Sequence, residues 1–289
     1  MKRATFTFIL ALFCVYAVNA QDLTSRKGIP ILPEKGDYSI SIDAVPFFEY
    51  LGNMFHGNNA TPAPTFDFPG LGDVPMWTIQ GRKFISATTA YRARVRLGYS
   101  CNTIKNTIED QTNTGTSPAY VDDKWTESKM NVVLGAGFEK RRGKGRVQGY
   151  YGAMVNILFA THGNRVVYGN TMDATYTNPL STVYPWVSAP EGYQTENAST
   201  RVVKDNAGLS FGAGANVFVG VEYFFAPKMS LGGEFSWGML FQITGKSRVQ
   251  SETMNGSDKE TTTYKYGGNT FFGIDNSNSG GAINLNFYF

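Results

Sequence analysis

The chain contains very little cysteine and histidine. Its 289 residues include 2 Cys and 2 His. Cys14 lies inside an apolar N-terminal run that is typical of a cleaved signal, so Cys101 is the one cysteine of the mature chain and no internal disulfide can form. A lone cysteine cannot build a zinc site, and the sequence has no phosphate loop and no dinucleotide motif, so we expect no metal and no cofactor.

Long apolar runs are missing after the N-terminus. Residues 1–20 have the form of a secretory signal peptide, because Lys2 and Arg3 precede the apolar run 6–18 and the mature chain would begin at Gln21. No later run reaches the ~20 apolar residues that a membrane-spanning helix needs. The sequence therefore predicts an exported protein that can lie in a membrane only as a closed barrel.

A large excess of either charge is also missing. The chain carries 26 Lys+Arg against 23 Asp+Glu, and the loss of Lys2 and Arg3 with the signal leaves a net charge of about +1. A nucleic-acid-binding domain would show a basic patch or stripe. We expect no nucleic-acid partner.

Glycine and aromatic residues are abundant, with 32 Gly, 21 Phe and 16 Tyr. Many of them lie in segments where apolar and polar residues alternate with the two-residue period of a β-strand. In AYRARVRLGYS, residues 90–100, three arginines share one face and apolar residues share the other. In a soluble sheet those arginines would face water, whereas in a membrane barrel they would face the lumen.

Short breaks alternate with long polar segments along the chain. The breaks within the similar stretches 81–98 and 221–238, and the turn RRGKGR at 141–146, are short. The long polar segments are 52–73, 105–124, 163–205 and 246–268. The eight expected strands are 38–50, 74–85, 90–104, 128–140, 146–161, 207–225, 229–245 and 269–289. Tight turns at one end and long loops at the other are typical of outer-membrane barrels.

The sequence thus predicts an all-β fold, an eight-stranded antiparallel transmembrane β-barrel with short periplasmic turns and long extracellular loops. Residues 1–20 are the expected signal peptide, 21–36 a periplasmic N-terminal segment and 37–289 the outer-membrane β-barrel. The alternative is a soluble, secreted β-sandwich, which would alternate in the same way. We favour the barrel because the expected strands are longer than the ~5–6 residues of soluble strands and long enough to cross a bilayer obliquely.

The polar faces of the expected strands collect charges of both signs. These charges are Arg92, Arg94, Arg96, Asp43, Glu49, Glu139, Glu222 and Glu234. An eight-stranded barrel is just wide enough for side chains to fill it, and an unpaired buried ion costs several kcal/mol. We therefore expect an Arg–Glu network that plugs the lumen, with a gated or narrow ion path as the alternative.

Both histidines are expected at the external rim. Some small barrels are lipid-modifying enzymes that use His, Ser and Asp near the membrane surface, and His162 next to Thr161 could mimic them. Nothing in the spacing of His56 or His162 fixes a triad, which geometry defines. We expect that the protein is not an enzyme and has no catalytic residue.

Three segments resemble an outer-membrane β-barrel family of the Bacteroidota, small barrels of OmpA or OmpX size. They are the opening KGDYSISIDAVPFFEYLGNMF, the turn FEKRRGKGRVQGYYGA and the end GGAINLNFYF. The terminal NLNFYF, with Phe289 last, is similar to the signature that such proteins present to the barrel-assembly machinery. The resemblance covers most of the mature chain and implies the outer membrane of a Gram-negative bacterium, but it implies no activity.

The long loops are the better place for a function. The stretches 57–73 and 184–197 combine aromatic residues with Pro and Asn, and such loops on a rigid scaffold can bind proteins or glycans, or serve only as protective surface. We expect a cell-surface protein that is surrounded by outer-membrane lipid and has a structural or binding role. The alternatives are an accessory subunit of a larger secretion or uptake complex, a narrow channel and, third, a lipid-modifying enzyme.

Overall fold

The structure is a computed structural model, and it describes residues 23–43, 77–143, 145–186, 188–189, 192–274 and 280–289. The regular elements in these ranges are β-strands, and the paired strands are antiparallel. Within the described ranges, no helix has the length and apolar character needed to cross a bilayer. The prediction of an all-β, antiparallel fold is confirmed.

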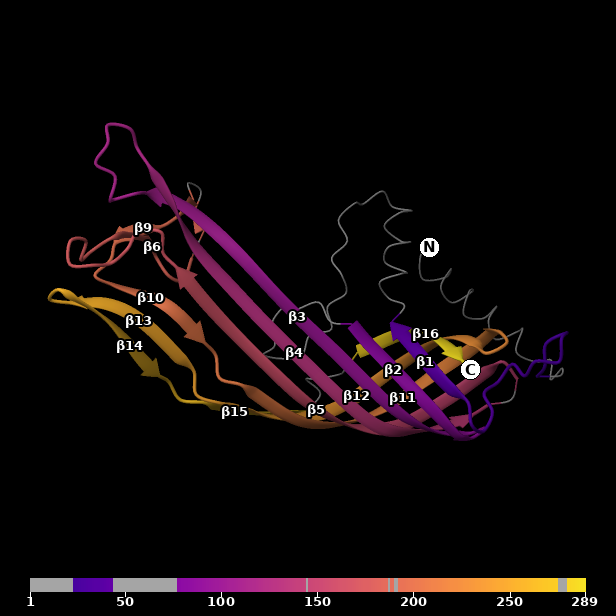
Figure 1. Cartoon of the computed structure of the whole chain (residues 1–289). Helices are drawn as coiled ribbons and strands as arrows, with labels where there is room; N and C mark the ends of the chain where they lie inside the picture. Colours follow the sequence, from indigo (N-terminus) through magenta and orange to yellow (C-terminus); the bar gives the residue numbers. More distant parts are fainter. Residues whose placement is uncertain (1–22, 44–76, 144, 187, 190–191, 275–279) are drawn as a thin grey trace, which may run out of the picture.

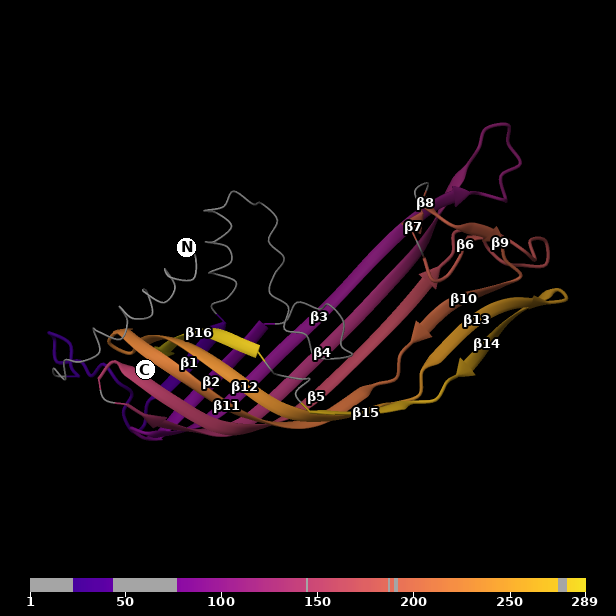
Figure 2. The same cartoon turned by 180° about the vertical axis from the view of Figure 1, so that it is seen from behind.

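Eight of the strands close into a ring (Figure 1; Figure 2). Their order is β1–β2–β3–β4–β5–β11–β12–β16, and β16 pairs back to β1. The ring strands are β1 (Tyr38–Asp43), β2 (Trp77–Ser86), β3 (Thr89–Glu109), β4 (Tyr120–Arg142), β5 (Val147–Val167), β11 (Ser210–Ala226), β12 (Met229–Thr244) and β16 (Gly280–Tyr288). Closure pairs both sides of each ring strand, which removes the exposed edges of an open sheet.

Short turns join the ring strands at one end. Two of them, at residues 87–88 and 227–228, follow a register shift in the preceding strand and lie in the two stretches that resemble each other in sequence. Lys228 adopts a φ of 57°, a left-handed conformation that is uncommon outside turns. We call this the turn end of the ring.

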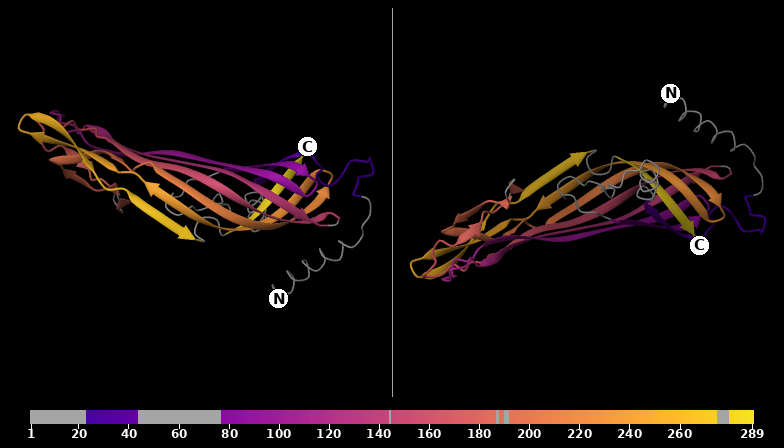
Figure 3. Two further views of the ribbon diagram at one scale, coloured as in Figure 1. Left: turned by 90° about the horizontal axis from the view of Figure 1, so that it is seen from below. Right: turned by 90° about the horizontal axis from the view of Figure 1, so that it is seen from above.

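At the other end, three ring strands continue into an extension of the same sheet. The outer parts of β3, β4 and β5 are extended by β10 (Thr200–Asn206), β13 (Arg248–Asn255) and β14 (Asp258–Lys265). Figure 3 shows this distal sheet running beyond the ring. The expectation of simple loops over 105–124, 163–205 and 246–268 was therefore wrong in part. The strands were not predicted from the sequence, because both of their faces are largely polar and apolar residues do not alternate with polar ones.

The remaining strands lie near this distal sheet or along β12. The segment 168–199 carries β6 (Leu180–Thr182), β7 (Ser188–Ala189), β8 (Gly192–Tyr193) and β9 (Thr195–Asn197). The expected last strand, 269–289, is divided into β15 (Asn269–Ile274) and β16, which pair with successive parts of β12. The chain therefore has more strands than the eight expected.

The two walls of the ring differ sharply in polarity. The outward wall exposes large apolar side chains, including Tyr91, Leu97, Tyr99, Leu134, Phe138, Val155, Val217, Val219, Phe235, Trp237 and Phe241. The inward wall buries polar side chains, including Ser39, Gln80, Arg82, Asn131, Glu139, Asn216, Glu222, Ser230, Glu234 and Asn286. This arrangement inverts the usual one, in which apolar groups are inside and polar groups face water.

A small apolar cluster closes the turn end. Ile31 packs there with Phe84, Ala90, Phe224 and Tyr288. The backbone of 23–37 is held against the ring, because Gly36 N donates to Phe84 O at 2.9 Å and Lys228 N donates to Ile31 O at 3.3 Å. The N-terminal segment is thus packed on the ring and covers its turn end.

Glycine makes room for one large inward side chain. Tyr150 on β5 is 1% exposed and its ring lies over Gly220 of β11, where an added β-carbon would collide with that ring. Gly233 of β12 points outward and has open space around the same position. The pattern of Gly on inward strand positions therefore reflects close packing inside the ring.

Candidate functional site

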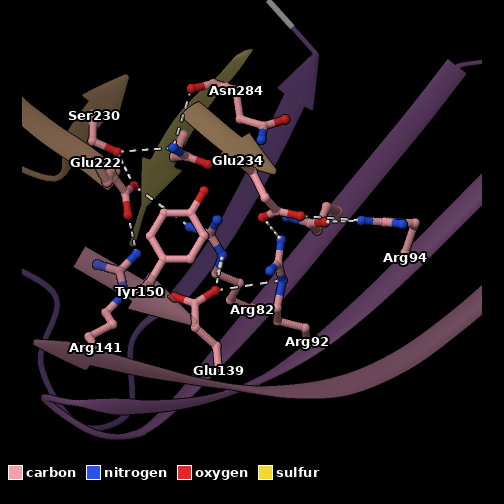
Figure 4. Close-up of polar contacts among 12 residues, drawn as sticks. Arg82, Arg92, Arg94, Glu139, Arg141, Tyr150, Glu222, Ser230, Glu234 and Asn284 are labelled. Carbon is pink, nitrogen blue, oxygen red and sulfur yellow. Dashed lines mark hydrogen bonds and ion pairs between the residues drawn. The ribbon is translucent and has the colours of Figure 1, made fainter. Parts of the chain in front are cut away.

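The three alternating arginines of β3 point into the ring. Arg92 and Arg96 are 2% and 3% exposed, whereas Tyr91 and Tyr99 on the other face are 59% and 70% exposed. The two-residue period of the strand separates these faces. The side chains of Arg92, Arg94, Glu139, Glu222 and Glu234 meet in one network, which Figure 4 shows.

The half of the network nearer the turn end centres on Arg141. Its Nε donates to Glu139 Oε1 at 2.7 Å, and its Nη2 donates to Glu222 and to the Tyr288 hydroxyl. Arg82 lies beside it, with Nε 3.1 Å from Glu139 Oε2 and Nη1 3.6 Å from Glu222 Oε1. Both carboxylates therefore face the guanidinium groups of Arg82 and Arg141.

Hydroxyl groups supply further hydrogen bonds to Glu222. The hydroxyls of Ser230 and Tyr288 both donate to Glu222 Oε1. Asn286 Nδ2 in turn donates to Ser230 Oγ at 3.1 Å. A fully buried carboxylate surrounded by donors in this way is satisfied, which offsets much of the cost of removing it from water.

The other half of the network centres on Glu234. Arg92 Nη2 donates to Glu234 Oε2 at 2.7 Å, and Arg94 Nη2 lies 3.6 Å from Glu234 Oε1. Arg92 Nε also lies 3.6 Å from Glu139 Oε2, so Arg92 joins the two halves. The network is continuous from Glu222 to Arg94.

These contacts cross the ring rather than follow its wall. In the ring order, β2 is opposite β11, β3 is opposite β12 and β4 is opposite β16. The pairs Arg82–Glu222, Arg92–Glu234 and Arg141–Tyr288 join those opposite strands. Side chains that meet from opposite walls at 2.7 to 3.6 Å fill the lumen at this level.

Aromatic rings pack between the guanidinium groups. Arg92 lies 3.9 Å from the ring centre of Phe218, and Arg82 lies 5.4 Å from that of Tyr150. Arg141 lies 5.1 Å from the ring centre of Phe84. Cation–π contacts of this kind gain strength where water is excluded.

Several members of the network were missed from sequence. Arg82 and Arg141 have inward parity on β2 and β4, but Arg141 was assigned to the turn RRGKGR. The structure also buries Arg96 on the inward wall. Asp43 lies in β1 with its backbone opposite Asn284, and its side chain is outside the described part, as is Glu49 altogether.

A second polar cluster holds the segment 168–199 on the distal sheet. Asp123 on β4 is fully buried and accepts hydrogen bonds from Gly169 N at 2.8 Å and from Thr182 N and Oγ1 at 2.7 Å. Arg201 on β10 donates to Glu252 at 2.6 Å and to Ser181 Oγ at 2.9 Å. We call the distal sheet together with 168–199 the distal unit.

Aromatic side chains make the rest of its core. The Trp125 ring lies 6.0 Å from that of Trp186 and 6.1 Å from that of Tyr184. Burial raises the pKa of the Tyr168 phenol well above its usual value, and burial together with the hydrogen bond to Asp205 does the same for the pKa of Tyr184. The distal unit is thus an ordered, packed structure.

The tip of the distal unit carries a polar cavity of about 500 Å³. Its lining residues are Glu109, Asp110, Gln111, Asn113, Tyr176, Leu180 and Asn197. Gln111 Nε2 donates to Asn197 Oδ1 at 3.3 Å, and its buried Oε1 accepts no hydrogen bond from a described residue. Carboxylates, carboxamides and a tyrosine around one hollow suit a polar ligand.

His162 lies at the junction between ring and distal sheet. Its Nε2 is 3.0 Å from Glu127 Oε1, which is also 3.1 Å from Lys129 Nζ. The pKa of Glu127 is lowered, because the hydrogen bond and charge of Lys129 and the contact with His162 outweigh its partial burial. Among the described residues, no group of three or more His, Cys, Asp and Glu could hold a metal ion. His56 lies outside the described ranges.

Comparison with known proteins gives few relatives. No family model and no curated protein matches the chain. A solved structure that it resembles is the outer membrane protein OprG from Pseudomonas aeruginosa, at 9% sequence identity and a TM-score of 0.26, over 90% of this chain and 98% of that chain. At that level of similarity no function passes from one protein to the other.

Proposed function

We propose that this chain is an integral outer-membrane β-barrel with a plugged lumen, and that it acts without catalysis through the distal unit at the cell surface. The observation that carries this is the inverted polarity of the ring. A soluble monomer rarely exposes an apolar patch larger than a few hundred Å². Here apolar side chains are exposed on every long ring strand, while ion pairs fill the interior.

The size of the apolar wall fits a membrane. Outward apolar residues run from Tyr91 to Tyr99 on β3 and from Leu231 to Ile243 on β12. At ~3.3 Å per residue and a tilt of ~40°, these runs span roughly 20–30 Å across the membrane, against ~25 Å for the apolar band of outer-membrane barrels. The turn end, with its short connections, would then face the periplasm and the distal unit the outside.

The lumen network favours a structural plug over a conducting path. Three contacts join opposite strands of the ring, and none of the six groups involved is exposed by more than 7%. An eight-stranded barrel has no spare width at such a level. We expect no ion conductance across a planar bilayer that contains the purified protein. Ion conduction by the unaltered chain would contradict the plug.

The distal unit is the part that can meet a ligand. Buried Asp123 and Arg201 hold its loop segment in place, and the tip cavity of about 500 Å³ is polar and open to the outside. A preorganised surface of this kind lowers the entropy cost of binding. We propose a saccharide or a polar protein loop as the ligand class.

The test uses the full chain refolded in detergent. Heat-modifiable gel mobility and a β-rich circular dichroism spectrum are expected, and a water-soluble monomer without detergent would overturn the membrane assignment.

Binding to an array of glycans and to surface extracts is then compared between the natural chain and Tyr176→Ala, with Tyr264→Ala on exposed β14 as the matched control. Binding lost only in Tyr176→Ala would support the tip cavity, whereas equal binding by all three would exclude it.

A second candidate is an accessory subunit of a larger outer-membrane complex. The observation that favours it is β14, which pairs only with β13 among the described strands and has exposed side chains along its length. Unpaired strand edges recruit partner strands. Purification from native membranes would show a stable large complex in this case, and a lone barrel would argue against it.

A further inference from the structure

The outward face of the distal sheet carries a belt of exposed cations. Cross-strand pairing sets Lys105 opposite Lys124, Arg165 opposite Lys204, and Arg248 opposite Lys265. The basic belt is defined as these six residues, which are all exposed. Residues directly opposite each other in an antiparallel ladder lie on the same face, and like charges in that position repel.

Neighbouring carboxylates do little to balance this belt. Asp122 lies 3.8 Å from Lys105 Nζ, and Glu252 is already paired with Arg201 and Lys259. The other five belt residues form no ion pair with a described carboxylate. They are Lys124, Arg165, Lys204, Arg248 and Lys265. Three like-charged pairs in one sheet give this face a positive potential, which attracts an anion.

Three of the six belt cations lie at the same sequence distance from the apolar wall. On β3, β4 and β5 the continuous runs of large apolar outward residues end at Tyr99, Met130 and Phe159, and the isolated Tyr120 and Val167 lie beyond the cations. The cations Lys105, Lys124 and Arg165 each stand six residues farther from the turn end. An even separation keeps both sets on one face of the strand. These three cations therefore lie on the same face as the apolar wall, beyond its end.

We infer that the basic belt binds the phosphate groups of a glycolipid with a phosphorylated saccharide headgroup in the outer leaflet. This inference rests on the proposed membrane position of the ring. Six residues along a strand tilted by ~40° raise the cations by ~15 Å above the apolar wall. The interfacial zone of a phospholipid leaflet is only about 5–8 Å thick, so a simple phospholipid headgroup would not reach the belt. A saccharide headgroup with phosphates does.

The test compares two neutralised variants of the full chain in detergent. The belt variant is Lys124→Gln, Arg165→Gln, Lys204→Gln. The matched control is Lys83→Gln, Lys140→Gln, Arg142→Gln, three exposed cations at the turn end. We expect the belt variant to bind purified lipopolysaccharide about tenfold more weakly than the natural chain, and the control to bind as the natural chain does.

The probes separate the possible occupants. Dephosphorylated lipopolysaccharide should bind the natural chain as weakly as intact lipopolysaccharide binds the belt variant, and binding should fall as salt is raised. Equal binding by belt variant and natural chain would overturn the inference. The inference would also be overturned if the natural chain bound phosphatidylglycerol vesicles or inorganic phosphate as strongly as it binds lipopolysaccharide. The belt would then bind anions in general and would not select this headgroup. Heat-modifiable mobility is scored in every sample, so a failure of the membrane assignment itself is seen separately.

Discussion

Arg92 on β3 and Glu234 on β12 reach each other across the full width of the ring, with 2.7 Å between Nη2 and Oε2. Their strands are opposite in the ring order, and both side chains are nearly or fully buried. A contact of this kind ties two distant parts of the wall together. It makes the interior a single structural unit rather than a set of separate strand pairs.

Removal of the charge of Glu234 should destabilise the ring. Glu234→Gln leaves Arg92 and Arg94 without the carboxylate they share, and an uncompensated buried charge costs about 3–5 kcal/mol. We expect a lower midpoint of unfolding in guanidinium by gel mobility. Glu260→Gln, on exposed β14, is the control and should leave the midpoint unchanged. An unchanged midpoint in Glu234→Gln would mean that the network contributes little to stability.

Gly220 should tolerate no side chain. Gly220→Ala places a methyl group against the Tyr150 ring, and overpacking of a filled interior costs about 1–3 kcal/mol. Gly233→Ala on the neighbouring strand meets open space and serves as the control. Refolding yield and unfolding midpoint are measured for both. Equal values for the two variants would show that Tyr150 moves aside freely.

The ring was predictable because its signal is local. The strict alternation of apolar and polar residues in β3, β5, β11 and β12 indicates which residues share a face. The short turns indicate which strands are neighbours. The distal sheet was not predictable in this way. Strands such as β14, whose sequence is DKETTTYK, are exposed at nearly every position and have no apolar face that would mark them.

The membership of the lumen network was only partly predictable. Parity on a strand placed Arg92, Glu139 and Glu234 on inward faces, but it cannot say which opposite strands meet. Arg141 was hidden because the turn was expected to begin at residue 141, whereas β4 runs to Arg142. Tyr288 has the inward parity of Asn286, but a tyrosine in a terminal strand suits either wall, so it was not assigned to the network. Only the closed ring shows that its hydroxyl reaches Glu222.

The distal unit should depend on a single buried carboxylate. Asp123→Asn keeps the shape but replaces one acceptor oxygen by an amide donor facing Thr182 N, and loss of such hydrogen bonds to a buried charge costs about 1.5–3 kcal/mol. We expect faster protease cleavage within 168–199 while the ring keeps its heat-modifiable mobility. Asp122→Asn, on the exposed face next to it, is the control. Equal cleavage rates in the two variants would remove Asp123 from this role.

Alkaline pH should loosen the distal unit before the ring. Burial raises the pKa of Tyr168, and burial with the Asp205 hydrogen bond raises that of Tyr184. An unfolded tyrosine ionises near pH 10. The stability that these neutral phenols contribute is therefore complete below about pH 10 and is lost as the pH rises from there toward the folded pKa.

We expect cleavage within 168–199 by an alkaline-active protease to rise steeply between pH 9 and about 11. In Tyr168→Phe, Tyr184→Phe the rise should be much shallower, and in Tyr266→Phe, an exposed tyrosine, it should match that of the natural chain. An equally steep rise in the double variant would assign the transition to other groups.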